Sequence, residues 1–174
     1  MKKRQQWGLT KLKLYLKQKV FSWRDRFFVK DESGNDCYAV EGATIPFIKQ
    51  LRVFDATGNV VAQVEQKSKG FSMFRFTVDI NGREACVIVK KFAWIGHKYN
   101  IEGLSWQLRG DFSAHEYELL DGNRVVMKID KKIISWGDSY ELDIADPKHE
   151  LLYLCIALAV DCSLDIQNRQ RRRV

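Results

Sequence analysis

Hydrophobic and polar residues alternate with a period of two along most of the chain. From Lys11 to Val20, leucine or valine occupies most even positions and lysine most odd positions. Because successive side chains of a β-strand point to opposite faces, this alternation predicts a strand with one buried face. The same pattern predicts about twelve strands, near residues 12–20, 25–30, 36–41, 48–54, 60–67, 72–80, 83–91, 97–102, 104–110, 114–120, 124–132 and 138–145.

Short turn sequences separate four pairs of the predicted strands. Each turn combines an aspartate with a glycine, and the glycines are Gly34, Gly58, Gly82 and Gly122. The strongest signal is Asn81-Gly82, because both residue types tolerate the positive φ of a tight hairpin turn. Such turns join antiparallel neighbours, so the chain is predicted to be a succession of locally connected strands. Three of the second strands end in lysine, at Lys67, Lys90 and Lys91, and Lys131 and Lys132.

One segment departs from the alternation. Asp146 is suited to cap a helix and Pro147 to occupy its first position. The run that follows is apolar on every face, which is typical of a helix buried on all sides. The sequence therefore predicts a central hydrophobic helix near residues 147–164. The side chains expected to form its buried surface are Leu151, Leu152, Leu154, Cys155, Ile156, Leu158 and Val160.

A closed antiparallel β-barrel of about twelve strands around this helix accommodates both patterns and leaves no open sheet edge. The predicted fold class is mainly β. The 174 residues are enough for one domain. We predict a basic N-terminal tail over residues 1–10, a single barrel domain over 11–166 and a basic C-terminal tail over 167–174. Asp161 and Asp165 then lie at or beyond the helix end, where negative charge is unfavourable and the sequence does not explain it.

The formal net charge of +7 arises from the two ends of the chain. Lys2, Lys3 and Arg4 carry three of these charges, and Arg169 with 171–173 carries four, so residues 5–168 are neutral. A nucleic-acid-binding domain normally carries its positive charge on a folded face. We therefore expect no specific nucleic-acid partner.

The N-terminus lacks the apolar segment of a secretory signal, and the longest apolar run has ten residues, about half of a bilayer span. Cys37, Cys86, Cys155 and Cys162 match no zinc or redox spacing. These features predict a cytoplasmic protein, free or peripheral at a membrane, with reduced thiols, no metal and no cofactor.

Catalytic motifs are absent from the sequence. His97, His115 and His149 are isolated, and no nucleophile elbow, phosphate-binding loop or dinucleotide fingerprint occurs. We therefore predict no catalytic residues and no enzymatic activity.

A basic stripe on the first predicted strand is the best binding candidate. It consists of Lys11, Lys13, Lys17 and Lys19, with Arg24 and Arg26 close by in the sequence. One interpretation is contact with phosphorylated headgroups of an anionic membrane surface. The other is a solvated strand face whose lysines discourage edge pairing.

Several motifs occur in a set order along the chain: residues 16–35, residues 108–132, residues 138–146 and the end of the apolar run, Ala157-Leu-Ala-Val-Asp161. Together they resemble the LOR family, and residues 16–35 resemble its bacterial branch. The resemblance covers about residues 11–166. It implies the tubby C-terminal-like fold, a twelve-stranded barrel around a hydrophobic helix. Tubby proteins bind phosphoinositides through basic side chains, which makes a phosphoinositide-like headgroup a candidate partner. For the bacterial branch the family implies no established activity.

Two functions remain open at this point. The first is a non-enzymatic cytoplasmic protein that binds anionic phospholipid headgroups or a small ligand. The alternative is a protein-interaction or structural module without a lipid ligand, whose protein partner the sequence does not identify.

Overall fold

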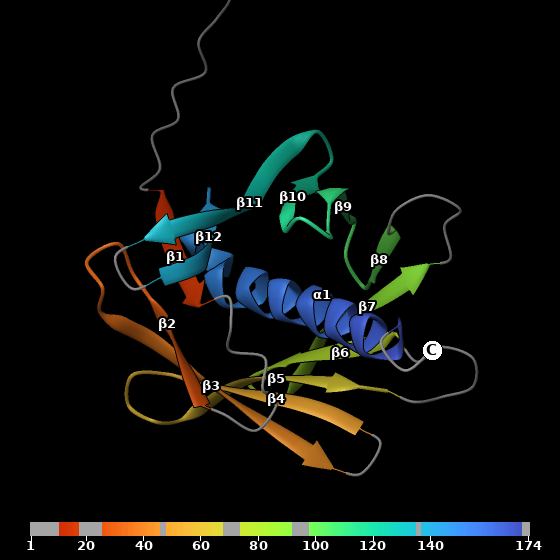
Figure 1. Ribbon diagram of the computed structural model, residues 1–174, viewed down its shortest axis with the longest axis horizontal. Helices are drawn as coiled ribbons and strands as arrows, with labels where there is room; N and C mark the ends of the chain where they lie inside the picture. The colour runs from red at the N-terminus through yellow and green to blue at the C-terminus, as the bar shows by residue number, and fades with distance from the viewer. Residues whose placement is uncertain are drawn as a thin grey trace, which may run out of the picture.

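The computed structural model describes residues 11–17, 26–45, 48–67, 74–91, 98–134 and 137–171. Within these residues, twelve antiparallel strands close into a barrel that surrounds one long helix (Figure 1). Strand order follows the chain, and β1 completes the barrel by pairing with both β2 and β12. This confirms the predicted mainly β fold class and the closed barrel around a C-terminal helix.

The strands lie close to the predicted ranges. They are β1 (Leu12–Lys17), β2 (Arg26–Lys30), β3 (Asp36–Ile45), β4 (Ile48–Phe54), β5 (Val60–Gln66), β6 (Arg75–Ile80), β7 (Arg83–Lys91), β8 (Lys98–Glu102), β9 (Trp106–Asp111), β10 (Glu116–Asp121), β11 (Arg124–Ile134) and β12 (Gly137–Ile144). The β6–β7 turn has the expected geometry, with φ of 49° at Asn81 and 76° at Gly82. Positive φ at both central residues matches the twist of the flanking strands.

The helical segment begins as the sequence predicts. The short 3-10 helix η1 (Pro147–His149) precedes α1 (Glu150–Arg171), and the Asp146 carboxylate accepts a hydrogen bond from the Lys148 backbone N–H. Tyr38 of the barrel wall donates a hydrogen bond to the Glu150 carboxylate in the first turn of α1. Local residues such as Asp146 therefore determine where the helix starts, and the hydrogen bond from Tyr38 connects that end to the barrel wall.

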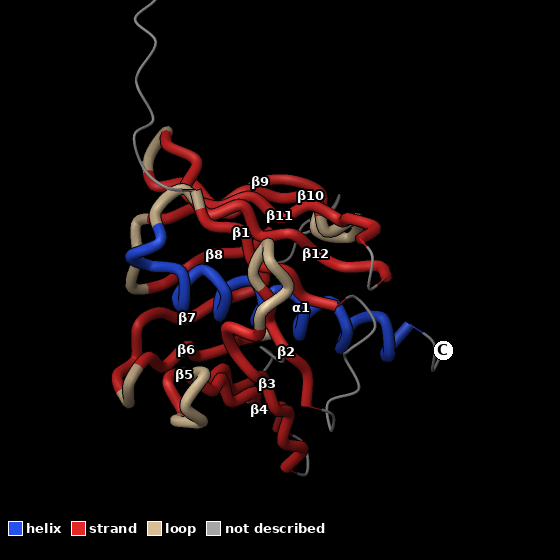
Figure 2. The backbone as a smooth tube through the Cα atoms, turned by 90° about the vertical axis from the view of Figure 1, so that its left-hand side faces the viewer, coloured by secondary structure: helices blue, strands red, loops and turns tan. Residues whose placement is uncertain are grey.

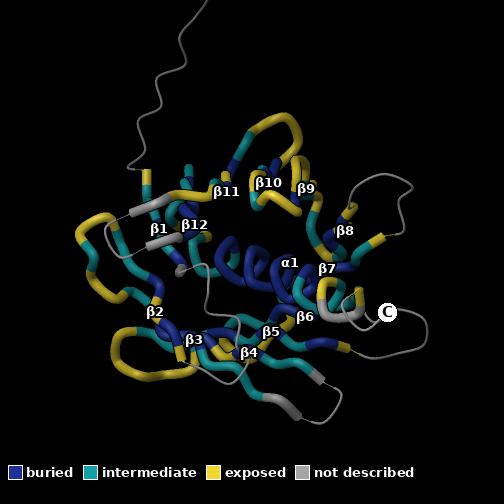
Figure 3. The backbone as a smooth tube through the Cα atoms, in the orientation of Figure 1, coloured by how far each residue is buried: buried dark blue, intermediate teal, exposed yellow. Residues whose placement is uncertain are grey.

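The helix runs through the barrel interior, as Figures 2 and 3 show. Leu151 and Leu152, near its start, are half-buried. The next five side chains of the expected surface are buried: Leu154, Cys155, Ile156, Leu158 and Val160. They pack against inward-facing side chains of the strands in one continuous core.

The predicted helix end near residue 164 is wrong, because α1 continues to Arg171. Residues 167–171, expected in a tail, are therefore helical, while residues 1–10 and 172–174 lie outside the described residues. The two puzzling aspartates are inside the helix, and each has a partner on the wall. Asp161 pairs with His115 at 2.6 Å and Asp165 with Lys49 at 2.8 Å. The side chains of His115 and Lys49, and not the end of the helix, therefore interact with these two carboxylates.

Because the strands alternate in direction, the barrel has two different ends. We call one the turn end. It carries the β2–β3, β4–β5, β6–β7, β8–β9 and β10–β11 turns and the start of the helical segment. We call the other the exit end, because α1 ends there, among the other strand termini (Figure 2).

Candidate functional site

Basic residues gather at the exit end of the barrel. Eight lysines and arginines lie at or next to the described strand termini there: Lys17, Arg26, Lys49, Lys67, Arg75, Lys90, Lys91 and Lys98. Arg109, Lys131 and Lys132 lie within three residues of the ends of β9 and β11 at the same end. The turn end carries Asp31, Asp36, Asp55, Glu102 and Asp121, together with Lys30, Arg83, Arg124 and Lys148, and the exit end also carries Glu65, Asp111 and Glu116. The nearly neutral domain is therefore polarised along the barrel axis.

The predicted basic stripe does not form one surface of free charges. Lys11 lies 3.2 Å from Asp143, and Lys13 lies 3.3 Å from Glu141, which also accepts a hydrogen bond from the Tyr15 hydroxyl. These acids belong to β12, which barrel closure places beside β1. Closure therefore neutralises the first half of the stripe.

Two further residues of the stripe, Lys17 and Arg26, lie at the exit end. Lys17 ends β1, and Arg26 begins β2, where its guanidinium lies 3.1 Å from Glu41 and stacks on the rings of Phe28 and Phe54. Lys19 and Arg24 lie outside the described residues.

Four exposed lysines at the exit end have no ion pair with a described residue. They are Lys91, Lys98, Lys131 and Lys132. Lys91 of β7 and Lys98 of β8 are directly opposite in the strand register. Like charges in this position repel and destabilise the pairing unless an anion compensates them. Three of the four were visible in the sequence as lysines that end hairpin strands.

Lys90 differs from these four. Its ammonium donates a hydrogen bond to the Gln167 side chain of α1 at 2.6 Å and lies 5.0 Å from the centroid of the Phe74 ring. Partial burial lowers the pKa of Lys90 to about 8. Lys90 therefore connects β7 to α1 through this hydrogen bond, and we do not count it among the exposed lysines.

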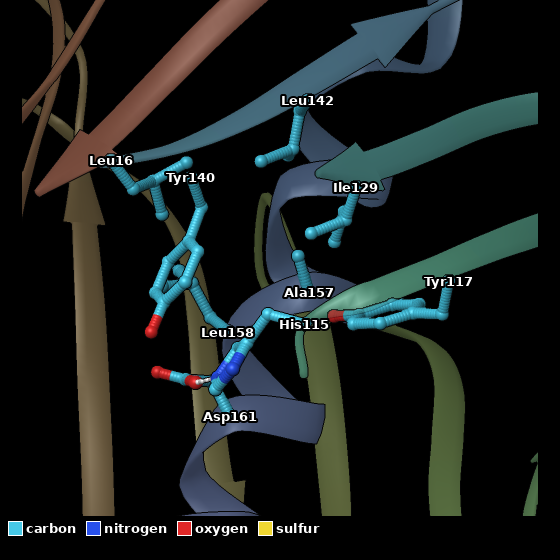
Figure 4. Close-up of a pocket in the computed structure, with 9 residues that line it drawn as sticks. All are labelled: Leu16, His115, Tyr117, Ile129, Tyr140, Leu142, Ala157, Leu158 and Asp161. Atoms are coloured by element: carbon cyan, nitrogen blue, oxygen red, sulfur yellow. Dashed lines mark hydrogen bonds and ion pairs between the residues drawn. The ribbon is translucent and has the colours of Figure 1, made fainter. Parts of the chain in front are cut away.

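A buried polar cluster lies at the same end, between α1 and the β9–β10 turn (Figure 4). His115 Nε2 and Asp161 Oδ1 are 2.6 Å apart. The His115 ring stacks on Tyr140 with centroids 4.3 Å apart and an interplanar angle of 13°. Sequence reasoning missed this pair because each residue is isolated along the chain.

The β9–β10 turn holds His115 in this position. Asp111 accepts hydrogen bonds from the backbone N–H groups of Ser113 and Ala114 at 2.9 and 3.1 Å, and the His115 N–H donates to the Phe112 carbonyl. His115 has φ of 57°. A non-glycine residue in this region is strained, and such strain persists only where surrounding contacts over-determine it.

Asp161 retains an unsatisfied group. Asp161 is 9% exposed, and its Oδ2 atom is buried without a hydrogen-bond partner. Burial raises the pKa of the Asp161 carboxyl, and the contact with His115 opposes this effect. The adjoining recess has a volume of about 20 Å³ and is lined by Leu16, His115, Tyr117, Ile129, Tyr140, Leu142, Ala157, Leu158 and Asp161. That volume holds about one water-sized group.

Buried phenols near the cluster give a prediction for alkaline pH. Burial raises the pKa of Tyr99 to about 12 and that of the fully buried Tyr117 well above its usual value. A folded-state pKa above the unfolded value contributes stability below pH 10 that is lost as pH rises toward 12. We expect tyrosinate absorbance to show fewer than six phenols titrating before unfolding. Tyr99→Phe and Tyr117→Phe should each reduce the loss of stability between pH 10 and pH 12. Reversible titration of all six phenols near pH 10 in the folded protein would contradict the prediction.

The remaining candidate chemistry is limited. Within the described ranges, no group of three or more His, Cys, Asp or Glu side chains is arranged to hold a metal ion. The four cysteines are free thiols, three of them buried and Cys37 half-buried. In the part of the chain that the structure describes, no helix is both long and apolar enough to cross a bilayer.

Comparisons with known proteins agree with this architecture. The family model described as LURP-one-related matches residues 12–161. The uncharacterized protein YxjI of Bacillus subtilis is 35% identical over 153 residues, covering 88% of this chain and 94% of YxjI. A crystal structure of an Arabidopsis thaliana protein superimposes with a TM-score of 0.59 at 12% identity, covering 87% of this chain and 91% of the plant chain. At that identity the plant structure supports the fold alone.

Proposed function

This chain belongs to the LURP-one-related family, and from that premise we propose that it binds anionic phospholipid surfaces through the exit end of its barrel. The observation that carries the proposal is the set of four exposed lysines that form no ion pair with a described residue, with Lys91 directly opposite Lys98 in the strand register. A bound phosphate would relieve the repulsion between these two. In this proposal the protein is a non-enzymatic cytoplasmic protein, peripheral at the membrane.

The magnitudes suit reversible binding. Each basic residue near an anionic membrane contributes about 1 kcal/mol. Lys91, Lys98, Lys131 and Lys132 together would contribute about 4 kcal/mol at low ionic strength, close to a thousandfold in partitioning. The stripe residues Lys11 and Lys13 would add little, because carboxylates already neutralise them.

The charge polarity of the barrel sets an orientation. A membrane that attracts the exit end repels the acidic residues of the turn end, including Asp31, Asp55 and Asp121. Arg171, exposed in the last turn of α1, lies on the attracted side. The proposed complex therefore has the helix C-terminus directed toward the headgroups.

Vesicle co-sedimentation tests the proposal. We expect salt-sensitive binding to vesicles containing phosphatidylglycerol or a phosphatidylinositol phosphate, and little binding to phosphatidylcholine alone. The double variant Lys91→Glu/Lys98→Glu should lose at least about tenfold in affinity, since it replaces two attractive charges with two repulsive ones. Circular dichroism and melting curves check that it remains folded.

The matched control makes the same change in net charge at the other end. Arg83 and Lys148 are exposed at the turn end and have no ion pair with a described residue. Arg83→Glu/Lys148→Glu should bind nearly as the wild type does. Equal losses in the two double variants would overturn an exit-end site, because only net charge would matter. No binding by the wild type would overturn the proposal and favour the protein-interaction alternative.

A further inference from the structure

We propose that the recess beside Asp161 receives the primary ammonium group of a phosphoethanolamine-type ligand, while the exit-end lysines hold its phosphate. Figure 4 shows one carboxylate oxygen of Asp161 turned toward His115 and the other turned away from it. That second oxygen, Oδ2, is buried and has no donor. The inference rests on the proposed function only for the contact with phosphate.

The unsatisfied oxygen calls for a hydrogen-bond donor. A buried acceptor without a partner loses its hydration and gains nothing in return. The walls around Oδ2 are aromatic and aliphatic, so a carboxylate and an ammonium would attract each other strongly there. Tyr140 and Tyr117 also line the recess.

Size selects a primary ammonium among organic cations. The recess of about 20 Å³ accommodates a single water-sized group. An –NH₃⁺ group is of that size and has three donors, whereas the trimethylammonium of choline is larger and has none. A hard metal cation would need several oxygen ligands, and among the described residues that line the recess Asp161 is the one acid.

A phosphate partner lies within reach of the recess. Lys131 is directly opposite Tyr140 in the β11–β12 register and two residues beyond Ile129, and both of these residues line the recess. Alternation along β11 puts Lys131 on the same strand face as Ile129, at the exit end, where it is exposed. Ethanolamine separates its ammonium from the phosphate by two carbons. In the proposed complex one ligand contacts both Asp161 and Lys131.

The first test compares two vesicle compositions at equal phosphatidylglycerol content. Part of the phosphatidylcholine is replaced by phosphatidylethanolamine in one set. We expect the wild type to bind that set about tenfold more tightly. Asp161→Asn keeps the shape of the side chain but replaces its carboxylate by an amide. The ratio of the affinities for the two vesicle compositions should then fall from about ten to about one. Asp165→Asn is the matched control, one turn along α1 and outside the recess, and should keep the preference.

A second test works without a membrane, so that the two proposals can fail separately. Glycerophosphoethanolamine should shift the His115 ring resonances, and glycerophosphocholine should not. Glycerophosphoethanolamine could shift the His115 resonances while the protein binds the two vesicle compositions equally. In that case the ammonium site is supported and its ligand is a soluble phosphodiester. Equal effects of both compounds, or of neither, would overturn the inference and leave the recess as a site for water only. Lys131→Gln, at an exposed position, should weaken the effect with unchanged melting behaviour, which covers the case in which Asp161→Asn fails to fold.

Discussion

Replacing Leu154 by aspartate is expected to abolish soluble folding of the chain, and Ile156→Asp should do the same. Both side chains are 0% exposed and lie in the first half of α1. Each substitution removes about 2 kcal/mol of apolar burial and leaves a carboxylate without a partner inside the barrel. Together these losses reach the stability of a typical domain, about 5–15 kcal/mol. Soluble yield, circular dichroism and thermal melting measure the outcome.

Val60→Asp is the matched control for that prediction. It introduces the same charge in place of a hydrophobic residue, but Val60 is 50% exposed at the start of β5. Its cost should stay near 1 kcal/mol. A Leu154→Asp variant that melts like the wild type would show that the barrel does not enclose the helix.

Gly110→Ala should destabilise the protein by about 3 kcal/mol or more, with contributions from backbone strain and from overpacking. Gly110 has φ of 138°, which L side chains rarely adopt. An added Cβ would lie 2.4 Å from the Glu116 carbonyl oxygen and 2.6 Å from the Tyr117 Cα. Both contacts are with backbone of β10, which pairs with Gly110, so relief requires the strands to separate.

Urea denaturation measures this loss, and Gly58→Ala separates its two causes. Gly58 also has a positive φ, 87°, but an added Cβ there meets nothing within 4 Å. It should cost about 1–2 kcal/mol, from backbone conformation alone. Similar losses at both glycines would mean that β9 and β10 do not approach as closely as described. Because Gly110 is the second-last residue of β9, close to the turn that carries His115, its substitution should also disturb the His115–Asp161 contact.

The sequence was sufficient to predict the barrel and the start of its helix. Alternation identifies the strands because each buries one face against a common core, and Asp146-Pro147 marks the helix start by local chemistry. The helix end could not be predicted in this way. The apolar run stops before Asp161, and what accommodates Asp161 and Asp165 inside a longer helix is their pairing with His115 and Lys49. Those partners are 46 and 116 residues away in the chain.

The candidate site was predictable only in part. Lysines at the ends of hairpin strands were visible, and alternating strand direction places them at one end of a barrel. The neutralisation of Lys11 and Lys13 was hidden, because their acidic partners lie on β12, more than 120 residues later. The recess depends on a left-handed His115 and an unsatisfied Asp161 oxygen, and no local pattern encodes either of them.

Closure between the first and the last strand has a consequence for biosynthesis. Leu12 pairs with Ile144, and the enclosed helix follows only after that strand. A ribosome must therefore synthesise the barrel domain as far as β12 before the wall can close, and α1 as well before the barrel can enclose it. Contacts of such high sequence separation slow folding and prolong the exposure of strand edges. During translation the chain would be a natural client for chaperones that shield nascent β-structure.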